Sequence, residues 1–163
     1  MQPTLTDFMR TSPDGTLEEI ANRYQVSLLE VINALPERTL TSGERFDLIW
    51  DEITRWGPVT ILVHTEDVIL EFKGDLPAGS HRYGYFNLQG KRGLSGHIKS
   101  SHCRHIALIE RDFMAMPTAS VLFLNAQGQA MLKIFVGRDS HHQLLPEQLA
   151  AFRQLANALN GEK

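Results

Sequence analysis

The sequence predicts a mixed α+β protein in which helices at both ends of the chain flank a largely antiparallel sheet. Apolar residues recur at helical spacing through the first third of the chain and again near its C-terminus. Between these regions, short segments rich in β-branched and aromatic residues follow one another with turn signals between them. We therefore expect a single domain over residues 1–163, with a helical part over about 1–57 and a β-rich part over about 58–163.

Three helices are expected in the N-terminal part. Thr16 precedes Glu19, and Ser27 precedes Glu30, with the spacing of a capping box. Pro36 ends the second helix, and a third helix is expected from near residue 42 to residue 57. The apolar positions that support the three helices are Leu17, Ile20, Ala21 and Tyr24; Leu28, Val31, Ile32 and Leu35; and Phe46, Ile49, Trp50 and Ile53.

A series of strands is expected once the pattern changes at Gly57. The strands cover residues 59–64, 68–73, 82–88, 94–99, 105–109, 120–125 and 130–136. Residues 65–67 and 125–129 are expected to form hairpin turns, the second with Gly128 at a position that tolerates positive φ. A final helix should begin at Pro146, because proline is favoured in the first turn of a helix.

Charge and cysteine content favour a soluble protein of the cytoplasm. The net charge of −3 excludes a surface that is basic throughout, so no nucleic acid partner is expected. Cys103 is the single cysteine, which excludes an internal disulfide and fits a reducing compartment. The N-terminus carries no pattern of a secretory signal, and no apolar stretch is long enough for a membrane span, so neither export nor membrane insertion is expected.

The two helices over residues 16–35 have the spacing of a helix-turn-helix motif. A helix that contacts DNA needs cationic or amide side chains to reach phosphates and base edges. The second helix offers Glu30 and Asn33, and no cation before Arg38. A packed helical hairpin is therefore favoured over a DNA-binding regulator.

Sequence motifs of catalysis are absent, so the chain is not expected to be an enzyme. It contains no nucleophile elbow, dinucleotide fingerprint or Walker loop, and the basic turn at residues 90–93 matches no phosphate-binding spacing. His102, Cys103 and His105 lack the second ligand pair that a structural zinc site requires.

Two of the seven histidines stand in segments that suit ligand binding. His64 ends an apolar strand, and His97 follows Gly96 in a second expected strand. Alternation places His97 on one strand face with Ser95 and Lys99, close to Lys91 and Arg92 in sequence. An imidazole with nearby cations suits haem, because imidazole ligates iron and cations pair with propionates. On spacing alone, ordinary hydrogen-bonded histidines are the commoner explanation.

Longer segments of the β-rich part favour haem ligation over ordinary hydrogen-bonded histidines. They are WGPVTILVHTEDVILEF (56–72), GYFNLQG (84–90), GHIK (96–99), HIALIER (105–111) and MLKIFVGRD (131–139). Through these segments the chain resembles the HutX/ChuX family of intracellular haem-utilisation proteins, closest to the ChuX branch, from about residue 13 to the final helix. The segments occur in family order and are far longer than any short motif considered above.

The resemblance implies a cytoplasmic haem carrier that receives haem after uptake and transfers it to a haem-accepting protein. It also implies a homodimer and a fold similar to one half of the larger HemS/ChuS-type proteins. The family's iron ligands map onto His64 and His97, with Lys91, Arg92 and Lys99 as candidate propionate or entrance contacts. In the HutX branch a tyrosine is implicated instead, and its counterpart here is Tyr83 or Tyr85.

Two questions about activity and assembly stay open at this point. HemS/ChuS-type proteins can also degrade haem, so a haem-degrading enzyme is the main alternative to a carrier. The apolar segment at residues 120–124 offers a possible interface strand for a dimer, although core packing is the commoner role of such positions.

Overall fold

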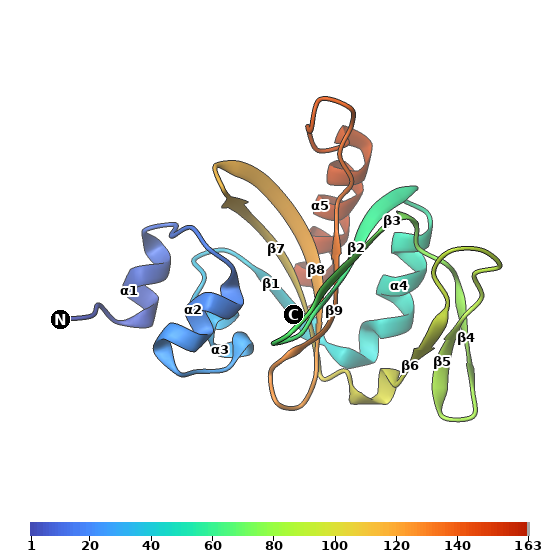
Figure 1. Cartoon of the computed structure of the whole chain (residues 1–163), viewed down its shortest axis with the longest axis horizontal. Helices are drawn as coiled ribbons and strands as arrows, with labels where there is room; N and C mark the ends of the chain where they lie inside the picture. Colours follow the sequence, from blue (N-terminus) through green and yellow to red (C-terminus); the bar gives the residue numbers. More distant parts are fainter. Residues whose placement is uncertain (163) are drawn as a thin grey trace.

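The computed structural model describes residues 1–162 and has two antiparallel sheets with helices on both sides of the larger one (Figure 1). The main sheet has the strand order β1-β7-β8-β9-β2-β3, and the small sheet has the order β4-β5-β6. The main sheet consists of β1 (Thr39–Ser42), β2 (Pro58–His64), β3 (Ile69–Asp75), β7 (His105–Phe113), β8 (Met116–Leu124) and β9 (Ala130–Phe135). The small sheet consists of β4 (Gly79–Arg82), β5 (Tyr85–Leu88) and β6 (Gly96–Ile98). The α+β class and the antiparallel sheet are confirmed.

The helices are divided between the two faces of the main sheet. One face carries α1 (Leu5–Arg10), α2 (Leu17–Tyr24) and α3 (Leu28–Asn33), and the other carries α4 (Phe46–Thr54) and α5 (Pro146–Gly161). Short 3₁₀ turns, η1 (Gly43–Arg45) and η2 (Ser100–His102), lead into α4 and β7. Figure 1 shows α1–α3 at one end of the molecule and the small sheet at the other, with α4 between the small sheet and the main sheet.

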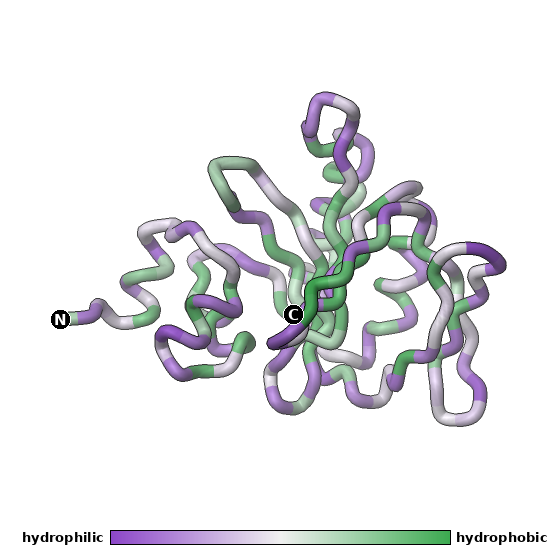
Figure 2. The backbone as a smooth tube through the Cα atoms, in the orientation of Figure 1, coloured by the Kyte–Doolittle hydropathy of each residue, from purple (hydrophilic) through white to green (hydrophobic). Residues whose placement is uncertain are grey.

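Alternation along the central strands produces two separate cores. On β7 and β8, Leu108 and Phe123 pack with α4, α5 and Phe86 of the small sheet. The neighbouring residues Ala107 and Leu122 point to the opposite face and pack with α1–α3. Both faces are therefore buried in the middle of the sheet, where hydrophobic segments are concentrated (Figure 2).

The central position of β8 decides the role of its apolar segment. Residues 120–124 lie in a strand paired with β7 on one side and β9 on the other, and all five are buried. The suggestion that this segment supplies a dimer interface is wrong, because its edges and faces are already covered. Core packing, the role favoured for these positions, is confirmed.

The N-terminal helices form a packed unit rather than a free DNA-reading motif. Thr16 and Glu19 make both hydrogen bonds of the expected capping box, and the Ser27 hydroxyl accepts from the Glu30 amide. α3 buries Leu28, Val31 and Ile32 in the second core. The Arg111 guanidinium of β7 donates to carbonyls of the loop before α2, at 2.7 and 2.8 Å. Burial lowers the pKa of Arg111, although an arginine remains charged at neutral pH.

Four expectations differ from the elements observed. The expected strand over 82–88 is a hairpin, because Tyr83 and Gly84 adopt φ of +55° and +81° and turn the chain between β4 and β5. The strands expected over 105–109 and 120–125 are longer and meet at a turn with positive φ at Met114 and Ala115. The N-terminal part, expected to be helical over about 1–57, also contributes the edge strand β1, which pairs with β7.

Several other elements agree with their expected positions, whereas α1 was not expected and the strand expected over 94–99 is confined to β6. β2 and β3 form the expected hairpin, β9 spans the expected segment, and α5 begins at Pro146. Gly128 has φ of +72° in the turn between β8 and β9. Among residues 1–162, no helix combines the length and the apolar character that crossing a membrane requires.

Candidate functional site

His64 lies at the end of β2 and points toward the N-terminal helices. Strand alternation places it on the same face as Thr60 and Leu62, opposite to Val59 and Ile61, which pack in the core beneath α4. Its Nδ1 atom lies 3.2 Å from an Oε2 oxygen of Glu18, in the first turn of α2. The His64 side chain is 16% exposed, so the ring is largely enclosed without being sealed.

A buried lysine completes this cluster. Lys133 on β9 lies opposite Leu62 in the sheet, and its ammonium contacts the same Glu18 carboxylate. Only 8% of the Lys133 side chain is exposed, and an ammonium buried to that extent needs an opposite charge. We refer to Glu18, His64 and Lys133 as the α2–sheet cluster.

The Nε2 atom of His64 is the open position of the cluster. Within residues 1–162 it has no hydrogen-bond partner, and it is not among the side-chain nitrogens closed off from solvent. The 3.2 Å contact lacks hydrogen-bond geometry, because both Glu18 oxygens are buried without a hydrogen-bond partner. A carboxylate can only accept, so a rotation of the ring that completes this hydrogen bond makes Nδ1 the donor. A neutral imidazole that donates through Nδ1 keeps its lone pair on Nε2, the form in which histidine ligates metals.

A groove of about 450 Å³ lies on the same side of the main sheet, toward the other end of β2. Thr60 and Leu62 form part of its floor, and Phe135 of β9 lies beside them. Two residues along a strand span roughly 6.6 Å, so His64 follows directly after Leu62 on this face. The groove is lined by Thr60, Leu62, Glu71, Lys73, Phe113, Thr118, Ala119, Phe135, Val136, Arg138, Asp139, His142 and Leu144. We call it the β2–β9 groove.

The chemistry of the groove suits a large, mostly apolar ligand with acidic groups. Leu62, Phe113 and Phe135 provide apolar surface, and Lys73 and Arg138 provide positive charge beside the carboxylates of Glu71 and Asp139. Arg138 is fixed by hydrogen bonds to the carbonyls of Pro117 and His142, at 2.6 and 3.0 Å. Pockets of this size, with apolar walls and a few polar groups, are typical small-molecule sites.

His97 lies in a different place, on the outer face of the small sheet. Phe86 and Ile98 turn inward to the core, so Asn87 and His97, which face each other across β5 and β6, turn outward. The His97 Nδ1 atom is 2.5 Å from the Asn87 Oδ1 atom. The Tyr85 ring lies 5.8 Å from the His97 ring, and the Lys99 ammonium lies 5.5 Å from the Tyr85 ring.

The other predicted residues surround this second cluster at the surface. Tyr83 occupies the β4–β5 turn, is 86% exposed and is approached by the Arg82 guanidinium. Lys91 and Arg92 are exposed in the loop before β6, and Gly93 of that loop approaches the Phe72 ring of β3. The structure thus brings His97, Tyr85 and Lys99 together, as expected from their shared face, and leaves Lys91, Arg92 and Tyr83 beside them.

The two predicted histidines do not converge within one chain. His64 faces α2, whereas His97 belongs to a sheet that packs on the opposite face of the main sheet. No contact in residues 1–162 joins the two clusters, and no three His, Cys, Asp or Glu side chains in that range are placed to hold a metal ion. Each histidine therefore offers at most one ligand to a metal bound at its own site.

Sequence reasoning missed Glu18, Lys133, Lys73 and Arg138. Lys133 carried the one usable signal, because it is a lone cation within the otherwise apolar segment of β9. Glu18 lies 46 residues before His64 in the chain, and only the packing of α2 on the sheet brings them together.

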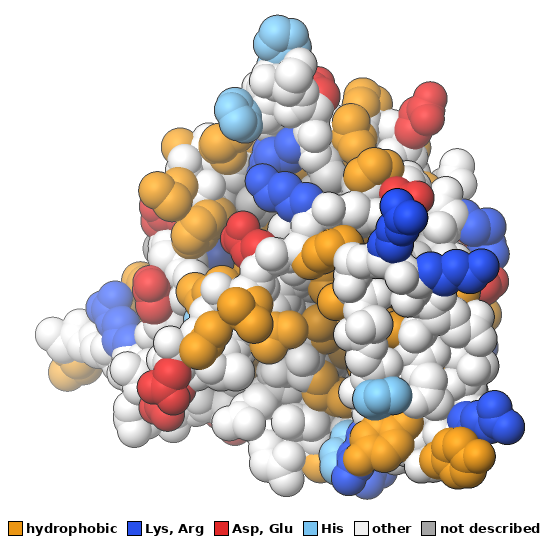
Figure 3. Space-filling model, turned by 45° about the vertical axis from the view of Figure 1, so that its right-hand side comes forward, with side chains coloured by type: hydrophobic (Ala, Val, Ile, Leu, Met, Phe, Trp, Pro, Cys, Tyr) orange, Lys and Arg blue, Asp and Glu red, His pale blue; other side chains and the backbone are white. Residues whose placement is uncertain are grey.

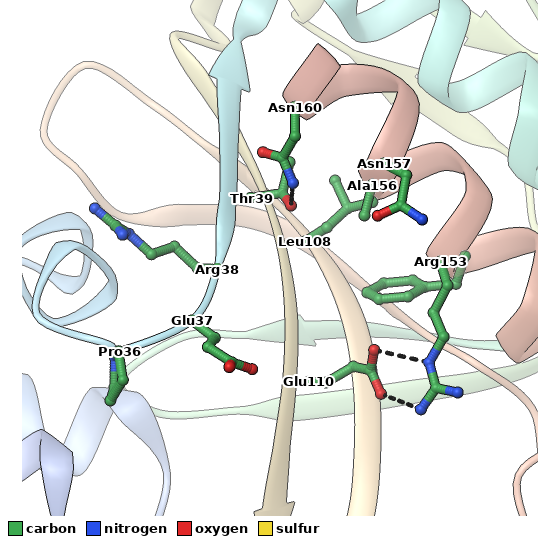
Figure 4. Close-up of a pocket in the computed structure, with 11 residues that line it drawn as sticks. Pro36, Glu37, Arg38, Thr39, Leu108, Glu110, Arg153, Ala156, Asn157 and Asn160 are labelled. Atoms are coloured by element: carbon green, nitrogen blue, oxygen red, sulfur yellow. Dashed lines mark hydrogen bonds and ion pairs between the residues drawn. The ribbon is translucent and has the colours of Figure 1, made fainter. Parts of the chain in front are cut away.

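A second cavity, of about 430 Å³, lies between β1, β7 and α5 (Figure 4). Its floor and walls are mostly polar, and Glu110 and Arg153 are joined across it by hydrogen bonds of 2.9 and 3.1 Å. It contains no histidine, cysteine or tyrosine. The cavity offers no imidazole, thiolate or phenolate to haem iron, so the candidate site remains with the α2–sheet cluster and the β2–β9 groove.

Comparison with known proteins gives a consistent family. Residues 39–155 match the family model described as haem utilisation ChuX/HutX. The chain is 32% identical, over 95% of its length and 82% of the relative's, to the intracellular heme transport protein HutX of Vibrio cholerae. Two solved structures of ChuX are 59% and 58% identical, cover 98% and 96% of this chain and 99% of their own, and give TM-scores of 0.95 and 0.92. The second of these is described as a heme binding protein.

A more distant likeness concerns the fold alone. The heme degrading enzyme ChuS of Escherichia coli O157:H7 is 10% identical, with a TM-score of 0.76. The match covers 94% of this chain and 48% of ChuS. The expected similarity to one half of such proteins is confirmed.

Proposed function

The chain belongs to the haem utilisation ChuX/HutX family, and from this premise we propose that it binds haem and carries it to a haem-accepting protein. The names of its relatives support the proposal, since HutX is called an intracellular heme transport protein and ChuX a heme binding protein. We place this activity in the cytoplasm, in agreement with the name of the HutX relative.

The observation that carries the proposal is the open Nε2 atom of His64, which lies two residues along β2 from Leu62 of the β2–β9 groove without lining that groove itself. Imidazole nitrogen is a common axial ligand of haem iron. The apolar residues Leu62 and Phe135 suit the faces of the macrocycle, and Lys73 and Arg138 suit its propionates. The residues present therefore fit haem, and His64 is the ligand that we assign first.

The cluster on the small sheet is a second place that would offer ligands to haem iron. His97 and Tyr85 lie together there, with Lys99 nearby and Lys91 and Arg92 on the adjoining loop. One chain holds His64 and His97 apart, so an iron ligated by both would take them from two subunits. Such an arrangement agrees with the homodimer that we propose for this protein.

A carrier differs from a haem-degrading enzyme in the fate of its ligand. A carrier should return intact haem, because its site binds the iron without supplying a catalytic group. The likeness to ChuS concerns fold at 10% identity and gives no reason to assign its activity to this chain.

Aerobic incubation of the haem-loaded protein with ascorbate, followed by addition of apomyoglobin, tests the proposal. We expect intact haem, no bilin and no released iron, and rapid appearance of the myoglobin spectrum. Free haem with ascorbate but without protein is the control for chemical degradation. Stoichiometric bilin formation would favour the enzyme, and failure of the chain to take up haem would contradict both functions.

A further inference from the structure

The Glu18 carboxylate lies between a histidine and a buried ammonium. Its Oε2 atom is 3.2 Å from the His64 Nδ1 atom and also contacts the Lys133 ammonium. The three side chains are 27%, 16% and 8% exposed, in the order Glu18, His64 and Lys133. This degree of enclosure makes the contacts stronger than those of an exposed ion pair.

The backbone on both sides holds this arrangement. Glu18 lies in the first turn of α2, which Thr16 caps with both hydrogen bonds of a capping box. Neighbouring residues of that helix, Leu17 and Ile20, are buried against the sheet. His64 and Lys133 project from paired strands of the same sheet. The carboxylate therefore reaches His64 from a packed helix and not from a mobile loop.

We propose that Glu18 is a positioning residue that prepares His64 to ligate haem iron, with Lys133 holding the carboxylate in place. This inference rests on the proposed haem-binding function. The observed 3.2 Å contact becomes a hydrogen bond on a small rotation of the ring, which fixes the proton on Nδ1 and leaves Nε2 free for the iron. A carboxylate partner also makes the imidazole a stronger electron-pair donor to the iron, as carboxylates do when they contact metal-bound histidines at other sites.

The position of Glu18 on α2 links the N-terminal helices to haem release. Glu18 belongs to the N-terminal helices, whereas His64 belongs to the sheet. A displacement of α2 from the sheet removes the Glu18 carboxylate from Nδ1 and weakens the ligand without altering His64 itself. The N-terminal helices thereby set how firmly the carrier holds its haem.

A double variant, Glu18→Leu with Lys133→Met, tests the assignment. The two substitutions replace a buried ion pair by apolar residues of similar volume, a change that proteins often tolerate. Replacing Glu18 alone leaves the ammonium of Lys133 buried without its partner, which risks unfolding. Glu66→Gln is the matched control, because it removes one carboxylate charge two residues from His64 in an exposed turn.

The first readout needs no haem. Nitrogen-15 NMR of the histidines at mildly alkaline pH, where imidazole is neutral, reports which ring nitrogen carries the proton. We expect the Nδ1–H tautomer for His64 in the wild type and in Glu66→Gln, and the Nε2–H tautomer in the double variant. An Nε2–H tautomer in the wild type would overturn the proposal.

The second readout is the rate of haem transfer to apomyoglobin. We expect the double variant to release haem about 10- to 100-fold faster than the wild type, with Glu66→Gln unchanged. In a His64→Ala background the double substitution should add nothing, because Glu18 acts through His64. Equal release by wild type and double variant would overturn the role of Glu18 while the carrier function stands. A wild type that binds no haem would instead contradict the carrier function itself.

Discussion

Gln148 is a buried polar side chain whose hydrogen-bond partners compensate for its burial. Gln148 on α5 is only 4% exposed, yet its amide group is fully used. Its nitrogen donates to the carbonyls of Trp56 and Pro58, at 3.0 and 2.6 Å, and its oxygen accepts from the Gly137 amide at 2.8 Å. This single residue ties the start of β2 to α5 and to the chain after β9.

Gln148→Leu should lower the free energy of unfolding of the protein. The substitution leaves the Gly137 amide and the Pro58 carbonyl without partners in a buried site, which costs about 1–3 kcal/mol. Urea unfolding followed by circular dichroism measures the effect. Gln154→Leu, on an exposed position of the same helix, should change stability little. Equal stability of both variants would show that the Gln148 network contributes nothing.

The Cys103 thiol should react slowly with thiol reagents in the folded protein. Burial raises the pKa of its thiol to about 11, so the reactive thiolate is scarce at neutral pH. Labelling with a chromogenic disulfide reagent should therefore be slow near pH 7 and should accelerate as the pH approaches 11. The same protein in guanidinium should react fully. Equal rates for the folded and unfolded chain at neutral pH would contradict this account.

Residue-level prediction from sequence succeeded where the neighbours in the chain supply the signal. The shared outer face of His97 and Lys99 follows from strand alternation, and the structure confirms it. The contact between Glu18 and His64 could not be predicted from the sequence, because it depends on how a helix packs on a sheet. No local pattern encodes such a contact.

At the scale of secondary structure, turns with unusual residues explain the main errors. A hairpin turn with positive φ at both central positions usually contains Asn, Asp or Gly, but here Tyr83 occupies the first position. The segment around it therefore resembled one continuous strand. β1 was not predicted because it is short and lies between two helical segments.

Gly43, where β1 passes into η1, tolerates no side chain. A Cβ atom at this position would lie 1.9 Å from the Cys103 carbonyl oxygen, in the connection that leads into β7. Gly43→Ala should destabilise the protein by about 1–3 kcal/mol, because backbone must move to accommodate the methyl group. Thermal unfolding measures the change. Gly161→Ala, which meets nothing within 4 Å, should be neutral or slightly stabilising, and a similar loss for both would refute the steric explanation.

At the scale of the whole molecule, the exposed edge of the main sheet stands out. β3 is an edge strand, and Ile69 and Leu70 are 55% and 63% exposed on it. Val63 and Val68 of the same hairpin are also exposed. Figure 3 shows hydrophobic side chains gathered beside a hollow near the centre of the face turned forward. An unpaired apolar edge invites pairing with another strand, and a second copy of the chain would supply one.

The double variant Ile69→Lys, Leu70→Lys should convert the proposed homodimer into a monomer. Charged side chains on an edge strand oppose pairing with a second strand. Size-exclusion chromatography with light scattering gives the mass directly. Met114→Lys, at a residue that is 70% exposed on the β7–β8 turn, should leave the dimer intact. A wild type with monomer mass would contradict the homodimer, and a dimeric double variant would contradict the use of this edge.

The central claim is that the chain binds haem through His64, and a haem titration followed by visible absorption tests it most directly. Wild type, His64→Ala, His97→Ala and the double variant should be compared under identical conditions. We predict a saturable Soret change at about one haem per chain in the wild type, with the larger spectral change and loss of affinity in His64→Ala. Identical spectra for all four proteins would contradict histidine ligation and direct attention to Tyr83 and Tyr85.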